Sequence, residues 1–504
     1  MRNEVLKSLY DLHSWIGLVS GVFLFAVVFS GTLALFDHEF GPWLRDEVTG
    51  TPPMHPRALD GAIADLLPVA EQTGGTLFIR LPTPFEPYIA AAVEKGDTLT
   101  VERYYDPSTG VDLPPPTEAA TDVMMLLHTD LLLPWPYGRY FVGILGVFML
   151  VLVFSGIFLH RKMVRELFTL RLHRSVRLMW TDTHKSVALW GLPFHLVLSL
   201  TGAILGLVAV TLLLGAGVSY KGDLAAAATA FGIDIGAPED MARVTTALPS
   251  ERLLEIAMGQ IEGMSPEHMA FKWPSGAHPQ VRIAGNVDGA LVFHPGVYID
   301  AVTGEVAKLG DWRRETAMKR VYAMITPLHY GSFGGVAVKL IYAILGSGMC
   351  LLTLSGLKIW LARRSEMRGD NGQGAFVWDR LFEGACYGLP LASVVLYGAV
   401  KLAPADIGSD DGTFTWVFLG LWIGFAAAIG FRTGLRNGAD CRFVGGMLLL
   451  CYPLATVVNT GLDPVRVILS GGIAVAAVDI AAMVLGLVLV LPTAVRGVTA
   501  LRVR

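Results

Sequence analysis

The chain has 504 residues, of which 53% are hydrophobic and only 16% are charged, and its mean hydropathy is +0.53. Soluble globular proteins carry charge on about a quarter of their residues, so this composition excludes a soluble protein and indicates a polytopic membrane protein. The formal net charge of −4 says little, because in a membrane protein the distribution of charge matters more than its sum. We expect the lipid bilayer as a partner and no nucleic acid.

The chain is predicted to cross the membrane eight times. The first apolar run has 23 residues, which is too long for the apolar part of a signal peptide, and no A-x-A cleavage site follows it, so we interpret it as a retained span. Apolar runs that are long enough to cross a bilayer as helices lie near residues 14–36, 138–160, 186–214, 335–361, 384–403, 413–431, 442–459 and 467–492.

Basic residues gather after every second span. Segment 161–185 holds seven Lys and Arg residues against two acidic ones. The other basic clusters, after the fourth, sixth and eighth spans, are Arg363, Arg364 and Arg368, then Arg432 and Arg436, and finally Arg496, Arg502 and Arg504. With eight spans all of them lie on one face, which the positive-inside rule makes cytoplasmic. We therefore expect both termini in the cytoplasm and two large loops, about 37–135 and 215–334, outside.

Each outer loop is predicted to form a small α+β domain. Both loops contain a helix-like stretch followed by short alternating strands, and both close with a similar turn, DPSTG at 106–110 and DAVTG at 300–304. The four cysteines all lie in spans or on the cytoplasmic side, so the outer domains cannot depend on disulfides. No cysteine pair has the spacing of metal ligands.

The first and third spans align without gaps. His13 precedes Gly31 by 18 residues, and His184 precedes Gly202 by the same 18. The two histidines are therefore expected at the cytoplasmic ends of parallel helices.

The second and fourth spans also align. Residues 144–156 (ILGVFMLVLVFSG) match residues 344–356 (ILGSGMCLLTLSG), and upstream His128 in LLHTD matches His329 in PLHYG. The first 360 residues are thus a duplicated unit of span, outer domain and span, with His128 and His329 just before the outer ends of their helices. The last 140 residues show no such kinship and contain no histidine.

Two further histidines break this symmetry. His160 ends the second span, and His195 lies 11 residues into the third, about 16 Å along a straight helix. A lone histidine at a helix end is commonly without function, whereas an ionisable residue at membrane depth is a functional hypothesis by default. Neutral imidazole is the commonest metal ligand, and haem iron takes axial histidines from facing helices. Zinc fits less well, because no cluster combines His with Cys or with a nearby His-x-x-x-His.

Several motifs in the correct order resemble the PepSY-associated transmembrane family, often described as iron-regulated membrane proteins. They are LHSWIGL, FSGTLALF, SGIFLHRK, FTLR, WTDTHKSVALWGLPFHLVLSLTGA, PLHYG and TLSGLKIW, and they cover roughly residues 5–365. The outer loops resemble PepSY domains. Some members are similar to ferric-siderophore reductases, which are inner-membrane di-haem b proteins that pass electrons outward to an iron chelate.

The expected fold is an all-α polytopic membrane bundle of about eight spans, with a duplicated 2+2 core, four C-terminal spans and two small α+β PepSY-like outer domains. The expected parts are the first span (1–36), the first outer domain (37–135), spans two and three with their basic loop (136–214), the second outer domain (215–334), the fourth span (335–372) and a four-span C-terminal accessory bundle (373–504). We expect this bundle to hold no redox centre and to keep its ionisable residues in its loops.

The resemblance implies two b haems whose iron is held by histidines, and bis-histidine ligation of both needs four of the six candidates His13, His128, His160, His184, His195 and His329. We expect His13 with His184 at the cytoplasmic haem and His128 with His329 at the outer haem, with His160 and His195 as reserve ligands. No Cys-x-x-Cys-His occurs, so covalent haem attachment is excluded. No catalytic residue is assigned.

The chain would then be a ferric-siderophore-type transmembrane reductase of the cell inner membrane. It has no Gly-x-Gly-x-x-Gly on a strand-to-helix turn and no P-loop, so the electrons would come from a separate cytoplasmic reductase or from quinol, for which a site between the two halves of the chain would serve. The alternative is a non-enzymatic PepSY membrane protein that binds or regulates an envelope partner.

Overall fold

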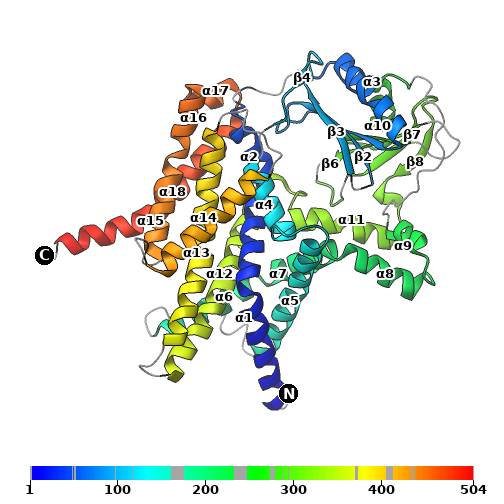
Figure 1. Cartoon of the computed structure of the whole chain (residues 1–504). Coiled ribbons are helices and arrows are strands. Elements are labelled where there is room, and N and C mark those ends of the chain that lie inside the picture. Colours follow the sequence, from blue (N-terminus) through cyan, green and yellow to red (C-terminus); the bar gives the residue numbers. More distant parts are fainter. Residues whose placement is uncertain are drawn as a thin grey trace. The chain divides into compact units, whose positions relative to one another are not determined.

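The computed structural model forms two compact units (Figure 1). The membrane unit comprises Met1–Val48, Thr117–Val208 and Lys339–Arg504, and the sheet unit comprises Thr49–Pro116 and Ala209–Val338. The structure describes residues 3–47, 49, 53–96, 98–116, 119–160, 175–231, 247–272, 279–287, 289–292, 294–368, 373–403, 412–432, 435 and 438–502. Residues 161–174 of the basic segment, Arg436 and Arg504 lie outside these ranges, as do the side chains of Arg368, Arg496 and Arg502.

The membrane unit is helical. Its helices are α1 (Asn3–Ala34), α2 (Asp37–Leu44), α4 (Ala119–Asp130), α5 (Tyr137–Leu159), α6 (Val176–Trp190), α7 (Leu192–Gly206), α12 (Gly335–Arg368), α13 (Gln373–Leu402), α14 (Thr413–Gly430), α15 (Gly438–Leu450), α16 (Tyr452–Thr460), α17 (Pro464–Ser470) and α18 (Ile473–Arg502). Within the described ranges, seven helices are long and apolar enough to cross a membrane, or eight if the bent pair α6 and α7 is one span. The chain is therefore a multi-pass membrane protein.

The third span differs from the straight helix expected over residues 186–214. It breaks at Gly191, where α6 and α7 meet at an angle of 72°, and α8 (Val208–Ser219) follows as a separate helix. Pro193 explains the break, because proline is tolerated in the first turn of a helix but removes a hydrogen bond from a helix interior. The depth of about 16 Å expected for His195 assumed a straight helix and does not apply.

The C-terminal helices share a core with the repeated part of the chain. One hydrophobic cluster joins Phe25 on α1, Trp43 on α2 and Met124 on α4 with Leu396 on α13 and Phe418 on α14. The accessory bundle expected over 373–504 is thus packed into the membrane unit, because the apolar faces of α13 and α14 are covered by helices of the first repeat.

The expectation that ionisable residues of the last four spans lie in loops is wrong. Asp479 on α18 and Lys401 at the end of α13 are almost fully buried. Asp479 accepts hydrogen bonds from the Trp43 indole, at 2.8 Å, and from Thr456, at 3.1 Å, while Lys401 pairs with Asp46. Buried charges persist where they are paired and hydrogen-bonded, so these contacts bind the C-terminal helices to α2.

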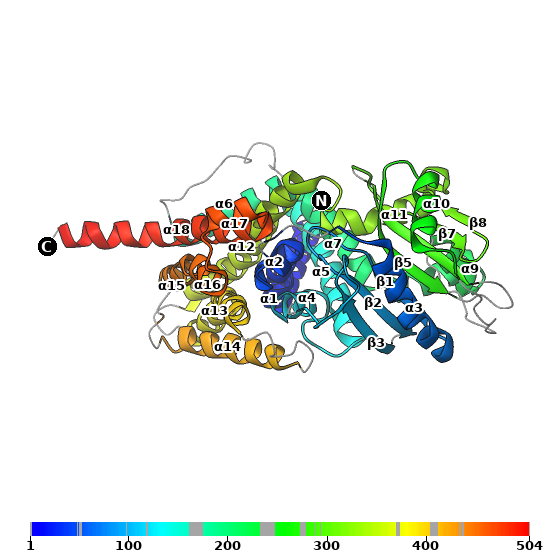
Figure 2. The same ribbon diagram turned by 90° about the horizontal axis from the view of Figure 1, so that it is seen from above.

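The sheet unit contains α3 (Pro56–Thr73), β1 (Thr76–Arg80), β2 (Ile89–Lys95), β3 (Thr98–Tyr105), β4 (Asp112–Leu113), α9 (Leu224–Phe231), α10 (Ser250–Gln260), β5 (Met264–Lys272), β6 (Gln280–Val287), β7 (Gly296–Asp300), β8 (Val306–Gly310), η1 (Trp312–Arg314) and α11 (Ala317–Tyr330). The described strands form one antiparallel sheet in the order β4-β3-β2-β1-β5-β6-β7-β8, and Figure 2 labels β1, β2, β3, β5, β7 and β8 of it. Helix α3 packs on β1 and β2, and α10 packs on β5 and β7.

The two outer loops therefore share one sheet, where we expected one small domain per loop. The halves meet at β1 and β5, with Leu77 paired to Phe271 and Ile79 paired to Met269. An unpaired edge strand exposes a row of backbone N–H and C=O groups, and joining the two edges satisfies them. Helix α3, helix α10 and both halves of the sheet enclose a single hydrophobic core.

A histidine-lined cavity among the membrane helices

His13 on α1 and His184 on α6 lie close together in the membrane unit. Their ring centroids are 6.3 Å apart, and their ring planes are inclined by 87°. An imidazole nitrogen binds a metal such as zinc at about 2 Å, so two imidazoles on opposite sides of one ion have centroids about 6 Å apart once the ring radii are added. The observed separation fits two ligands of a single metal ion.

Each of these histidines is held by the second span of its own repeat. Nδ1 of His13 lies 2.8 Å from Ser155 Oγ on α5, and Nδ1 of His184 lies 3.0 Å from Ser355 Oγ on α12. Both serine hydroxyls donate to backbone carbonyls of their own helices, so their oxygens accept the Nδ1–H of the imidazoles. Nε2 is then the nitrogen with a lone pair for a metal, which is the usual arrangement around metal-binding histidines.

Two glycines give these rings their space. A Cβ atom at Gly156 would lie 3.6 Å from Cε1 of His13, and a Cβ atom at the equivalent Gly356 would lie 3.3 Å from Cε1 of His184. Alanine would touch the rings at these positions, and a longer side chain would compete with them for the same volume.

The two rings face a cavity of about 540 Å³, bounded by α1, α5, α6, α7 and α12. Its wall is largely apolar, with leucines on every one of these elements. Pockets for cofactors and drug-sized ligands commonly measure about 300–1,000 Å³ and combine apolar walls with a few polar groups. The histidines that line the cavity are His13, His160, His184 and His195.

Among the buried polar atoms at this cavity, Nε2 of His195 and Nε of Arg364 have no hydrogen-bond partner within the described part of the chain. Buried polar groups are nearly always paired, and the described residues supply no partner for these two atoms, so a ligand bound in the cavity would satisfy them. Lys185 and Arg363 also line the cavity, and together with Arg364 they would attract a carboxylate-bearing ligand.

Of the remaining predicted ligands, His160 lines the same cavity, whereas His128 and His329 are not among its lining residues. His160 caps the C-terminus of α5. His128 on α4 donates from Nδ1 to the Val27 carbonyl at 2.8 Å, and a Cβ atom at Gly31 would lie 2.5 Å from its ring. His329 lies near the end of α11 and belongs to the sheet unit. The two histidines expected at the outer haem therefore belong to different units.

Sequence reasoning missed one group of candidate ligands. Glu267, His268 and His294 converge in the sheet unit, although His268 and His294 are 26 positions apart in the sequence. These residues have no metal-ligand spacing in the sequence and no ligand counterparts in the other repeat. The pairing of strands in the sheet is what brings them together.

Comparison with known proteins supports the resemblance found in the sequence. The profile of a family described as the PepSY-associated TM region matches residues 10–363. A protein of Pseudomonas aeruginosa strain PAO1, described as uncharacterized protein PA4219, is 29% identical over 348 residues, which cover 65% of this chain and 83% of that protein. The matched region contains both repeats and all six candidate histidines.

Proposed function

The chain belongs to the PepSY-associated TM region family, and from this premise we propose that it is an inner-membrane electron-transfer protein that uses two b haems to reduce an acceptor outside the membrane. The acceptor would be an Fe(III) chelate such as a ferric siderophore. The observation that carries the proposal is the pair His13 and His184, 6.3 Å apart beside the cavity and each fixed by a serine.

The residues of the cavity suit the parts of a haem. Haem would supply reversible one-electron exchange at its iron. His13 and His184 would hold the haem iron, and Ser155 and Ser355 would hold both rings in the tautomer with Nε2 available. The leucine-rich wall would exclude water from the porphyrin face, and Arg364 would pair with a propionate.

A second haem would use His128 and His329. His128 is oriented by the Val27 carbonyl in the manner of a ligand histidine. His195, whose buried Nε2 has no hydrogen-bond partner among the described residues, is the first reserve ligand at the cavity, and His160 is the second.

The direction of transfer follows from the positive-inside rule. The basic residues near the start of α6 and the end of α12 would face the cytoplasm, which would put His13 and His184 near the entry side and the two large loops, about 37–135 and 215–334, outside. Electrons would come from a cytoplasmic reductase or from quinol, and the sheet unit would receive the iron chelate.

The first test is spectroscopic. Full-length protein expressed with added haem and purified in detergent should show a Soret band and close to two haems per chain, and its dithionite-reduced form should be reoxidised by ferric siderophores in stopped-flow traces. Absence of a Soret band would overturn the haem proposal and favour a binding or regulatory role. If the protein binds two haems but no ferric chelate reoxidises it, the proposal of electron transfer stands and the proposed acceptor is wrong.

A further inference from the structure

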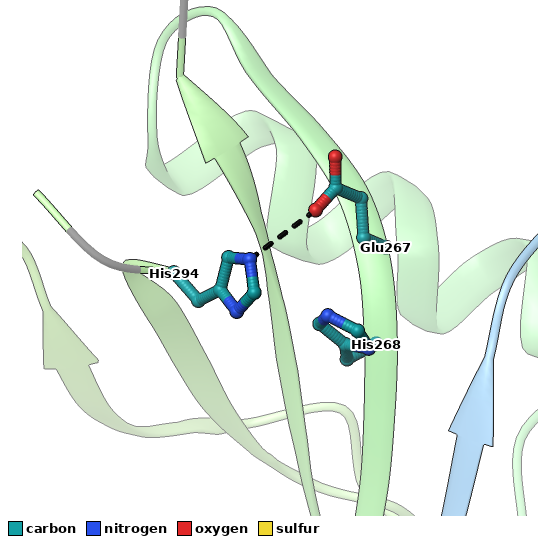
Figure 3. A group of neighbouring side chains, drawn as sticks. All are labelled: Glu267, His268 and His294. Atoms are coloured by element: carbon teal, nitrogen blue, oxygen red, sulfur yellow. Dashed lines mark ion pairs between the residues drawn. The ribbon is translucent and has the colours of Figure 1, made fainter. Parts of the chain in front are cut away.

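A second group of metal-binding side chains lies in the sheet unit (Figure 3). His294 Nε2 is 3.4 Å from Glu267 Oε2, and the rings of His268 and His294 have centroids 4.6 Å apart. One ligand atom from each of the three residues lies within 4.8 Å of the other two. A single ion placed among them would be within reach of two imidazoles and one carboxylate.

A bulge in β5 makes this convergence possible. Successive side chains of a regular strand point to opposite faces of the sheet, so Glu267 and His268 would normally diverge. The pairing with β6 is irregular here, with Pro266 opposite Gly285 and His268 opposite Ala284, so that Glu267 is the extra residue. Bulges re-aim side chains and are frequent beside functional sites.

The third ligand is held in an uncommon backbone conformation. His294 has a φ of +37°, a region that residues other than glycine seldom occupy. Arg282 donates to the carbonyl of His294 at 2.8 Å and fixes this segment against β6. Such conformations persist where the surroundings enforce them, and they gather at functional sites.

The other half of the sheet shows that the fold does not need these side chains. Aligning residues 77–82 (LFIRLP) with residues 269–274 (MAFKWP) makes Leu77 equivalent to Met269, so Gly75 and Thr76 stand where Glu267 and His268 stand. Counting back six residues from the equivalent turns at 106–110 and 300–304, Thr100 stands where His294 stands. The first repeat builds the same four strands with no ligand at any of the three positions.

We propose that Glu267, His268 and His294 bind a divalent first-row transition-metal ion in the sheet unit. Two imidazoles and one carboxylate suit zinc and ferrous iron, and three protein ligands leave coordination positions open for water or another ligand. The side chains of Glu267 and His294 are partly exposed, so an ion can enter from solvent. The site is separate from the haem cavity and does not depend on the proposed electron transfer.

Metals bind the neutral form of imidazole and the ionised form of a carboxylate. The nearby Arg80 forms ion pairs with Glu86, at 3.4 Å, and Glu102, at 3.7 Å, which offset its charge.

Zinc titration of the full-length protein tests the site. The protein should carry a tag without histidines, be stripped with a chelator, and be titrated with ZnCl₂ in detergent by calorimetry. We expect one saturable zinc site per chain, with affinity reduced at least about tenfold in His268→Ala and His294→Ala. Glu267→Gln keeps the shape of the side chain and should also weaken binding, which decides the matter if a histidine variant does not fold.

The matched control is His55→Asn. His55 is an exposed histidine of the same unit that caps α3 by accepting from the Arg57 amide, and asparagine preserves that role. The control should bind zinc like the wild type, and none of these variants should change the Soret band. An absence of saturable binding in the wild type, or unchanged affinity in the folded variants, would overturn the proposal.

Discussion

The two repeats contribute matching side chains to the membrane cavity and different ones to the sheet. In the membrane unit, His13 and His184 occupy equivalent positions, and the equivalent Ser155 and Ser355 accept from the same ring nitrogen. A site built in this way lies between the repeats, and neither repeat can complete it alone.

In the sheet unit only the second repeat carries ligand side chains. Glu267, His268 and His294 belong to β5 and the segment before β7, and the first repeat has glycine and threonines there. The membrane cavity thus uses residues that both repeats supply, whereas the cluster in the sheet unit uses residues of the second repeat alone. The same substitution at equivalent positions of the two repeats should therefore change haem binding at the cavity in the same way. Unequal effects would contradict this equivalence.

The largest effect is expected from His13→Ala and His184→Ala. Each removes one imidazole that would hold the haem iron, so each should abolish the haem of the cavity and lower the haem content from two per chain to one. Haem extraction and low-temperature spectra of the purified variants measure this. His38→Ala, at an exposed position of α2, is the control.

The reserve ligands sharpen this test. If His195→Ala removes the haem while His184→Ala leaves both haem spectra intact, the symmetric pairing is wrong and the buried Nε2 of His195 is the ligand.

Filling the cavity should have the next largest effect. Gly156→Leu and Gly356→Leu leave all ligands in place but crowd the rings of His13 and His184. Overpacking typically costs about 1–3 kcal/mol, which corresponds to roughly 5- to 150-fold weaker retention of haem. Haem transfer to apomyoglobin gives this retention.

A leucine at Gly420 in α14, where an added Cβ meets open space, is the matched control. Equal haem retention in all three leucine variants would show that the cavity does not hold a porphyrin near these glycines.

Removing the serines should have a smaller effect. Ser155→Ala and Ser355→Ala each take away an acceptor from Nδ1–H, which makes the imidazole a weaker donor to iron and should raise the midpoint potential. We expect both haems to remain bound and the two variants to shift the same potential in the same direction. Redox titration measures the shift, and opposite shifts, or shifts at different haems, would break the equivalence of the repeats.

The sequence was informative where spacing alone carried the signal. The 18-residue spacing from His13 to Gly31 and from His184 to Gly202 revealed the duplication, because helices of one bundle preserve such spacing. The 72° break at Gly191 was hidden, because the apolar run continues on both sides of it. The break bears directly on His195, whose ring lies over Gly191.

Pairing between distant segments could not be derived from the sequence. Nothing in β1 or β5 alone states that Leu77 pairs with Phe271, so the two outer loops looked like separate domains. The same register and one bulge create the cluster around His268. Contacts between strands that are distant in the sequence depend on the assembled sheet, so no local sequence pattern predicts them.

The smallest effect is expected at the two turns, where the repeats are similar but not identical. Asp106 accepts hydrogen bonds from the amides and hydroxyls of Ser108 and Thr109, whereas position 302, equivalent to Ser108, is valine. These hydrogen bonds, with that from the Ser108 hydroxyl first, lower the pKa of Asp106 below its ordinary value. A carboxyl group with a lowered pKa in the folded state stabilises the protein above the unfolded value of about 3.9, and this stabilisation is lost as the pH falls through the folded value.

Ser108→Val makes the first turn like the second and should move the pKa of Asp106 toward its ordinary value. Asp106 is largely exposed, so we expect only a small decrease in the melting temperature of the full-length protein near neutral pH. The difference between variant and wild type should shrink as the pH falls below about 3.9, because protonation removes the same stabilisation from both. Asp112→Asn, at an exposed position of β4, controls for the loss of a surface hydrogen-bonding group. A difference that stays constant down to pH 3 would mean that Ser108 acts through packing, and the two turns would then differ in shape rather than in charge.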